Sequence, residues 1–116
     1  MQDINFGDRR IFERIPAKLT ARCIDLYSKN TSLAQTCDIS AQGVGLVTDK
    51  EFLPHSPLEV WLQSPNNGES LLFGGEVVWT KLIEPNKYRV GINFKKVELM
   101  RVSQILRSIV TRARYY

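Results

Sequence analysis

The fold is decided by residues 58–82, LEVWLQSPNNGESLLFGGEVVWTKL, in which two alternating runs flank one turn. In the first run Leu58, Val60 and Leu62 recur at every second position, which is the period of a half-buried β-strand. Residues 64–69 contain Asn and Gly, which accept positive φ and favour a tight hairpin turn. The run from 70 to 82 alternates again, and Gly74-Gly75 in its middle predicts the bend that closes a small barrel.

Alternating runs also lie on both sides of this hairpin. We expect further strands within residues 18–27, 33–39, 44–48 and 88–95, joined by turns rich in polar residues, glycine or proline. The sequence therefore predicts a mainly β fold, a six-stranded antiparallel β-barrel.

The period changes from 2 to 3.6 near Val97. The apolar residues that follow fall within an arc of roughly 140° at 100° per residue. These residues are Leu99, Val102, Ile105, Leu106, Ile109, Val110 and Ala113. The pattern predicts a C-terminal amphipathic α-helix at about 98–113 that covers the apolar face of the sheet.

The composition is that of an ordinary globular domain, with 116 residues, 43% of them hydrophobic. We divide the chain into a flexible, arginine-bearing N-terminal arm, residues 1–16, and a barrel domain, residues 17–116. Pro16 biases Ile15 toward extended geometry and argues against a helix through the arm. Neither an apolar run of about 18 residues nor a signal-peptide pattern is present, so we expect a cytoplasmic protein without membrane insertion.

Several classes of chemistry are disfavoured by the residues available. Cys23, Cys37 and His55 supply too few ligands for a zinc site, and we expect neither a metal nor a cofactor. No catalytic triad or phosphate-binding loop is recognisable, so the chain does not look like an enzyme. The net charge of +4 favours an anionic partner, but it does not choose between nucleotide, nucleic acid and an acidic membrane surface.

The first candidate binding stretch is DRRIFERIP at residues 8–16, which holds Arg9, Arg10 and Arg14. An arginine presents a rigid fork of donors and a planar face, so it can hold a phosphate and stack on a base. A solvated terminal arm has the same composition, so this stretch alone does not establish a site.

The second candidate is DISAQG at residues 38–43. Asp38 and Ser40 occupy alternate positions and are expected on one face of a strand end. Asp38 can accept hydrogen bonds from a guanine edge or from an arginine, and Ser40 can donate to a phosphate. Gly43 permits positive φ or the close approach of a backbone. The same residues also fit a common serine turn that ends in glycine.

Together these stretches make the chain resemble the PilZ domain family. The resemblance rests on RxxxR at Arg10 and Arg14, 23 intervening residues, and DxSxxG beginning at Asp38. It extends to VVW at 77–79, to the strand at 90–94 and to the closing helix, and it covers essentially the whole chain. It implies a six-stranded antiparallel barrel with a C-terminal helix, and binding of the bacterial second messenger cyclic di-GMP.

The resemblance also implies roles for single residues. The two RxxxR arginines would contact the phosphates and guanines of the ligand. The three motif positions of DxSxxG would meet a guanine edge and the neighbouring phosphate. Arg9 would stack on a second, intercalated ligand molecule.

We therefore expect a stand-alone cyclic di-GMP receptor whose N-terminal arm changes conformation on binding and signals to an unidentified partner protein. Motility, adhesion or exopolysaccharide production are the processes that the family suggests. One alternative is a protein-interaction module that binds no nucleotide. A less favoured alternative is a single-stranded nucleic-acid binder, since small basic barrels can stack bases on aromatic side chains. Alternation favours core positions for most of the large aromatic residues, which argues against that alternative. These residues are Trp61, Phe73, Trp79, Tyr88 and Phe94.

Overall fold

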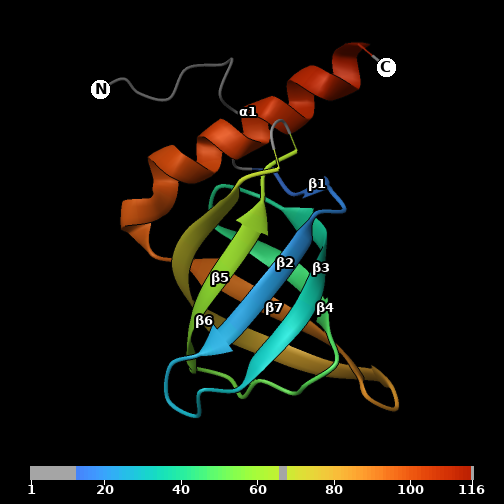
Figure 1. Cartoon of the computed structure of the whole chain (residues 1–116), viewed down its shortest axis with the longest axis vertical. Coiled ribbons are helices and arrows are strands. Elements are labelled where there is room, and N and C mark those ends of the chain that lie inside the picture. Colours follow the sequence, from blue (N-terminus) through green and yellow to red (C-terminus); the bar gives the residue numbers. More distant parts are fainter. Residues whose placement is uncertain (1–12, 66–67, 116) are drawn as a thin grey trace.

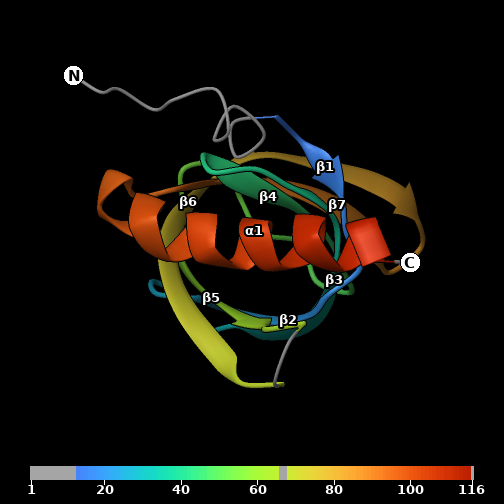
Figure 2. The same cartoon turned by 90° about the horizontal axis from the view of Figure 1, so that it is seen from above.

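Six strands of the computed structural model close into an antiparallel barrel, and one helix crosses an end of the barrel (Figures 1 and 2). The structure describes residues 13–65 and 68–115. The barrel strands are β2 (Thr20–Asp25), β3 (Thr31–Ile39), β4 (Gly43–Thr48), β5 (Pro57–Gln63), β6 (Ser70–Glu84) and β7 (Lys87–Phe94). The helix is α1 (Leu99–Tyr115), and a 3₁₀ turn (Lys96–Glu98) leads into it. The expected fold class is confirmed.

The barrel closes because β3 and β4 pair with each other as well as with their other neighbours. The pairing runs β3-β2-β5-β6-β7-β4 and returns from β4 to β3. The long strand β6 pairs with β5 in its first half and with β7 in its second half. Gly75 lies between these halves, where a Cβ would stand 2.6 Å from the carbonyl oxygen of Asn93. A glycine is therefore required where β6 bends toward β7.

The sheet begins inside the segment that we assigned to the arm. β1 (Ile15–Pro16) pairs with the end of β3, with Ile15 opposite Ile39 and Pro16 opposite Asp38. Ile15 takes the extended geometry expected before Pro16, and its side chain packs against the core. Residues 1–12, which include most of the predicted arm, lie outside the described residues.

The core is built from the inward positions of regular strands. On β5 these positions are Leu58, Val60 and Leu62, and on β2 they are Ala21 and Cys23, all at most 3% exposed. Each fully buried aliphatic side chain contributes roughly 1.5–3 kcal/mol of transfer free energy. Burial also raises the pKa of the Cys23 thiol from 9.0 to about 12, so this cysteine stays protonated in the core.

The helix α1 lies across the barrel opening and closes it (Figure 2). Its side chains Val102, Ile105 and Leu106 are buried in the same core as the strands. Glu98 anchors its start, since one carboxylate oxygen accepts a hydrogen bond of 2.7 Å from Gly74 N and the other a bond of 3.1 Å from Arg101. The helix is thus a structural lid, and within the described residues no helix has the length and apolar character to span a membrane.

Candidate functional site

The two candidate motifs meet through an ion pair between Arg14 and Asp38. Arg14 Nη2 and Nε donate to the same carboxylate oxygen, Oδ1 of Asp38, at 2.7 and 3.1 Å. The other oxygen, Oδ2, lies 3.6 Å from Nη2 of Arg89 on β7. The side chains of Arg14 and Arg89 are 49% and 46% exposed, so both guanidinium groups remain accessible. Two cations next to one carboxylate leave this locality positively charged.

A β-bulge turns Asp38 toward this meeting point. The register between β3 and β4 shifts after Thr36, so that Cys37 is an extra residue and Asp38 stands opposite Gly45. Thr36 and Ile39 are buried on the inside, at 2% and 0% exposure, while the Asp38 side chain is 26% exposed. Strict alternation would have placed Asp38 on the inside with Thr36. The extra residue reverses that direction.

A second bulge does the same for Trp79 on β6. The register with β7 shifts between Val77 and Trp79, so that Val78 is the extra residue. Val77 is fully buried, whereas Val78 and Trp79 are 45% and 44% exposed. The sequence placed Trp79 on the same face as Phe73 and Val77, with the core as its expected environment. That expectation is wrong for Trp79, because alternation is broken one residue earlier.

Two glycines form the floor between Asp38 and Trp79. Across four neighbouring strands, Asp38 stands opposite Gly45, Gly45 opposite Gly91, and Gly91 opposite Trp79. A Cβ at Gly45 would lie 2.8 Å from Oδ1 of Asp38, and a Cβ at Gly91 would lie 2.4 Å from the Trp79 ring. The carboxylate and the indole therefore lean over bare backbone from opposite sides, which only glycine permits.

These side chains surround a pocket of about 260 Å³ on the outside of the barrel. Its lining residues are Arg14, Asp38, Gly45, Val78, Trp79, Arg89, Gly91, Ile92 and Asn93. It combines an accessible aromatic face, two guanidinium groups and a carboxylate, so it can stack on a planar ring and neutralise an anion. Within residues 13–65 and 68–115, no group of three residues could hold a metal ion.

Ser40 lies in the turn after β3 and Gly43 is the first residue of β4, and neither residue lines the pocket. The Ser40 side chain is buried at 1% exposure, and its hydroxyl accepts a hydrogen bond of 3.2 Å from Gln42 N. Ser40 N also donates to the carbonyl of Gly43 at 2.8 Å. A Cβ at Gly43 would lie 2.0 Å from the carbonyl oxygen of Ile92, so its close approach is to β7. This geometry is that of the serine turn, while Arg9 and Arg10 lie outside the described residues.

Sequence reasoning missed several of the lining residues. Gly45 and Gly91 each interrupt an otherwise apolar or alternating strand, and glycine inside a strand often marks a close approach; this signal was available. Arg89 had none, because an arginine on an alternating strand usually points to solvent. Trp79 was noticed but assigned to the wrong side, since a single-residue bulge leaves no mark in the pattern.

The comparisons with known proteins agree with this fold. Residues 8–111 match the family model described as PilZ domain, so the chain belongs to the PilZ domain family. No curated protein matches this sequence. Among solved structures, the chain is similar to the PilZ domain of YcgR from Escherichia coli with c-di-GMP, with a TM-score of 0.68, 19% identity, and coverage of 92% of this chain and 93% of that chain.

Two longer proteins are also similar. A structure of YcgR from Escherichia coli in complex with c-di-GMP has a TM-score of 0.70 and 20% identity over 92% of this chain and 47% of that chain. The inhibitor of motility MotI/DgrA from Bacillus subtilis has a TM-score of 0.64 and 16% identity over 89% of this chain and 52% of that chain. The chain spans about half the length of these two proteins. At such identities the likeness shows the fold.

Proposed function

We propose that this chain is a receptor for cyclic di-GMP and that the ligand binds at the Arg14–Asp38–Trp79 pocket. The observation that carries the proposal is the placement of two arginines and a carboxylate opposite an accessible indole, over a floor of glycine. Membership of the PilZ domain family supports it, as do the ligand-bound YcgR structures with the same fold.

Each part of the pocket suits one part of a cyclic dinucleotide. The Trp79 ring offers a stacking face for a purine. Arg14 and Arg89 offer guanidinium donors to phosphate oxygens. Within the described residues no hydrogen bond reaches Oδ2 of Asp38, so this oxygen is open to the N1–H and N2–H₂ donors of a guanine. Micromolar binding needs about −8 kcal/mol net. Two or three charge-assisted contacts at ~1.5–3 kcal/mol each would supply part of it, and stacking of a base on Trp79 at ~1–3 kcal/mol would add to them, against the cost of ordering the bound groups.

The N-terminal arm supplies the rest of the proposed site. Arg10 would add a third guanidinium group, and Arg9 would stack on a second ligand molecule if two are bound. Ordering of the arm on the barrel would be the signal that a partner protein recognises. We propose motility, adhesion or exopolysaccharide production as the regulated process and the cytoplasm as its location.

Isothermal titration calorimetry with cyclic di-GMP tests this function. We expect micromolar or tighter binding to the wild type, and at least roughly tenfold weaker binding to Arg10→Ala and Arg14→Ala, since each loses charge-assisted contacts. Arg22→Ala is the matched control, because Arg22 is an exposed arginine of β2 that lines a different hollow. Equal affinity for all four proteins would refute the site, and no binding to the wild type would refute the function.

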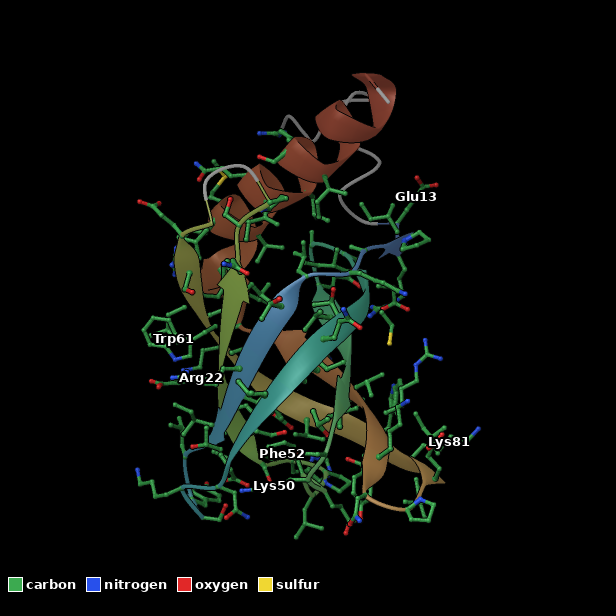
Figure 3. All side chains as sticks on the ribbon, turned by 45° about the vertical axis from the view of Figure 1, so that its right-hand side comes forward. Glu13, Arg22, Lys50, Phe52, Trp61 and Lys81 are labelled. Atoms are coloured by element: carbon green, nitrogen blue, oxygen red, sulfur yellow. The ribbon has the colours of Figure 1, made fainter. Side chains whose placement is uncertain are left out.

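A second candidate function, protein interaction without a nucleotide, is favoured by the outer face of β2 and β5. Leu33 (68% exposed), Arg22 and Trp61 stand in one row across β3, β2 and β5. They line a hollow of about 370 Å³. Figure 3 shows Arg22 and Trp61 together on the outside of the barrel. A partner complex that forms without cyclic di-GMP and is lost in Trp61→Ala would support this candidate.

A further inference from the structure

The segment that follows Arg14 pairs with β3 as β1 and then as β2, and the pairing is interrupted between these two strands. Thr36 of β3 lies opposite the interruption. Pro16 stands opposite Asp38 and Thr20 opposite Gln35, so three residues, 17–19, face the two residues 36 and 37 of β3. Such an interruption leaves backbone groups without their ladder partners.

The Thr36 hydroxyl supplies two of the missing partners. It accepts a hydrogen bond of 2.8 Å from Leu19 N and donates to the carbonyl oxygen of Ala17. The backbone provides two further bonds across the interruption, from Ala17 N to the Cys37 carbonyl at 3.1 Å and from Thr36 N to the Leu19 carbonyl at 2.9 Å. Thr36 is 2% exposed, so water cannot readily replace its hydroxyl.

This interruption coincides with the bulge that turns Asp38 outward. On one side of β3 the extra residue belongs to segment 17–19, and on the other side the extra residue is Cys37, opposite β4. Thr36 lies within the first irregularity and is the last regularly paired β3 residue before the second. Its hydroxyl therefore holds the backbone of residues 17–19, which follows Arg14, next to the bulge that turns the Asp38 side chain outward.

We propose that Thr36 is a positioning residue of the ligand site, because its buried hydroxyl holds the double irregularity that brings Arg14 to Asp38. It lines no part of the pocket and acts only through the backbone of residues 17–19 and 37–38. The ligand-binding part of this inference rests on the proposed function. The ion-pair part does not, because it concerns a contact between two residues of this chain.

Three variants separate positioning from packing. Thr36→Val keeps the size and branching of the side chain but removes both hydroxyl bonds. Thr36→Ser keeps the hydroxyl and removes a methyl group. Thr48→Val is the matched control, because Thr48 is equally buried at 2% and its hydroxyl donates to the Lys50 carbonyl, at the end of β4 away from Asp38.

The first measurement is cyclic di-GMP affinity by calorimetry. We expect Thr36→Val to bind about tenfold more weakly than the wild type, Thr36→Ser to bind within about twofold, and Thr48→Val to be unchanged in affinity although less stable. Wild-type affinity in Thr36→Val would overturn the proposal. So would equal weakening in Thr36→Ser or Thr48→Val, because packing or general stability would then explain the loss.

The second measurement needs no ligand. The ¹⁵N–¹H signal of Arg14 Nε, assigned by its disappearance in Arg14→Lys, reports the bond to Asp38 in the free protein. It should move toward the position of a free arginine in Thr36→Val and stay in place in Thr36→Ser and Thr48→Val. An unmoved signal in Thr36→Val would overturn the proposal, whether or not the wild type binds cyclic di-GMP. Absence of cyclic di-GMP binding to the wild type would refute only the proposed function.

A third measurement covers the case in which Thr36→Val does not fold. The Leu19 amide of the wild type should exchange with solvent as slowly as amides in the adjoining ladder, because Thr36 accepts its proton in a buried place. Fast exchange at Leu19 would show that the hydroxyl does not hold the interruption, and the proposal would fail.

Discussion

β5 and β6 are paired along seven residues, yet they contribute to the molecule in different ways. β5 alternates regularly from end to end, with Leu58, Val60 and Leu62 buried, and it builds core. β6 follows the same rule as far as Val77, then gains one extra residue at Val78 and presents Trp79 on the outside. Regular strands build the core of the barrel, and the strand with a bulge lines the pocket on its outside.

β3 likewise has a regular part and a part with a bulge. Its first half pairs regularly with β2, while its second half carries the bulge at Cys37 and presents Asp38 to the pocket. The two bulges lie on strands that are not paired with each other, and β4 and β7 stand between them with Gly45 and Gly91. The pocket therefore results from one extra residue in β3 and one in β6, which turn Asp38 and Trp79 outward on either side of the two glycines.

The largest expected effect comes from comparing two aromatic residues of β6. Phe73 and Trp79 have the same parity in sequence, but Phe73 is fully buried and Trp79 is 44% exposed. Phe73→Ala should lower the free energy of unfolding by ~3–5 kcal/mol because it leaves a cavity in the core. Trp79→Ala should cost about 1 kcal/mol or less, while cyclic di-GMP binding weakens.

Urea denaturation followed by circular dichroism measures both variants. If Trp79→Ala were as destabilising as Phe73→Ala, Trp79 would belong to the core and the bulge at Val78 would not exist in solution.

A smaller effect tests the burial of Cys23 on the regular strand β2 through the pH dependence of stability. Burial raises the Cys23 pKa from 9.0 to about 12, so the folded protein keeps the thiol proton after the unfolded chain has lost it. The stability that this thiol supports is fully present below pH 9 and is lost as the pH rises from 9 toward 12. By pH 10 the loss should be about 1 kcal/mol.

Urea denaturation of wild type and Cys23→Ala between pH 8 and pH 10.5 isolates this loss, because the other titrating groups are common to both proteins. The wild type should lose more stability than the variant over this range. Parallel curves would mean that the thiol is not buried as the regular alternation of β2 requires.

The smallest expected effect concerns Arg89, which lines the pocket. Arg89 Nη2 lies 3.6 Å from Asp38 and its side chain is 46% exposed, so the pair is screened and weak. Arg89→Ala should weaken cyclic di-GMP binding by roughly two- to fivefold and leave the unfolding free energy within ~0.5 kcal/mol.

Lys81→Ala is the matched control for Arg89→Ala, because Lys81 stands opposite Arg89 on β6 with the same charge and does not line the pocket. Calorimetry at low salt compares the two. An equal effect of both substitutions would assign the change to net charge and not to a contact of Arg89.

The fold was predictable because burial imposes periods that the sequence records directly. The hairpin at 58–82, the strand at 88–95 and the helix after Val97 each show a clear period in the sequence, and all three exist at nearly the predicted bounds, although the bulge at Val78 breaks the alternation late in β6. The glycine pair at 74 and 75 predicted a bend in β6, and the structure adds a reason for Gly75, whose Cβ would collide with the Asn93 carbonyl oxygen of β7. A six-stranded barrel was predicted from the strand pattern and from the resemblance to the PilZ domain family, while the pairing of β3 with β4 that closes it came from the structure.

The candidate site was predictable only in part. Arg14 and Asp38 were named from the two motifs, and the structure joins them. Ser40 and Gly43 were named with them, but in the structure Ser40 lies in the turn that follows β3 and Gly43 begins β4. The binding roles of these four residues remain predictions, as do those of Arg9 and Arg10.

The sequence by itself determined the periods, and with them the strands, the helix and most of the core, because alternation and amphipathicity are local consequences of burial. It also determined that arginines and an acidic motif were present. Only the tertiary structure decided that Asp38 and Trp79 face outward across Gly45 and Gly91. The direction of a side chain after a bulge depends on the register with a neighbouring strand, and that register is a property of two segments far apart in the chain.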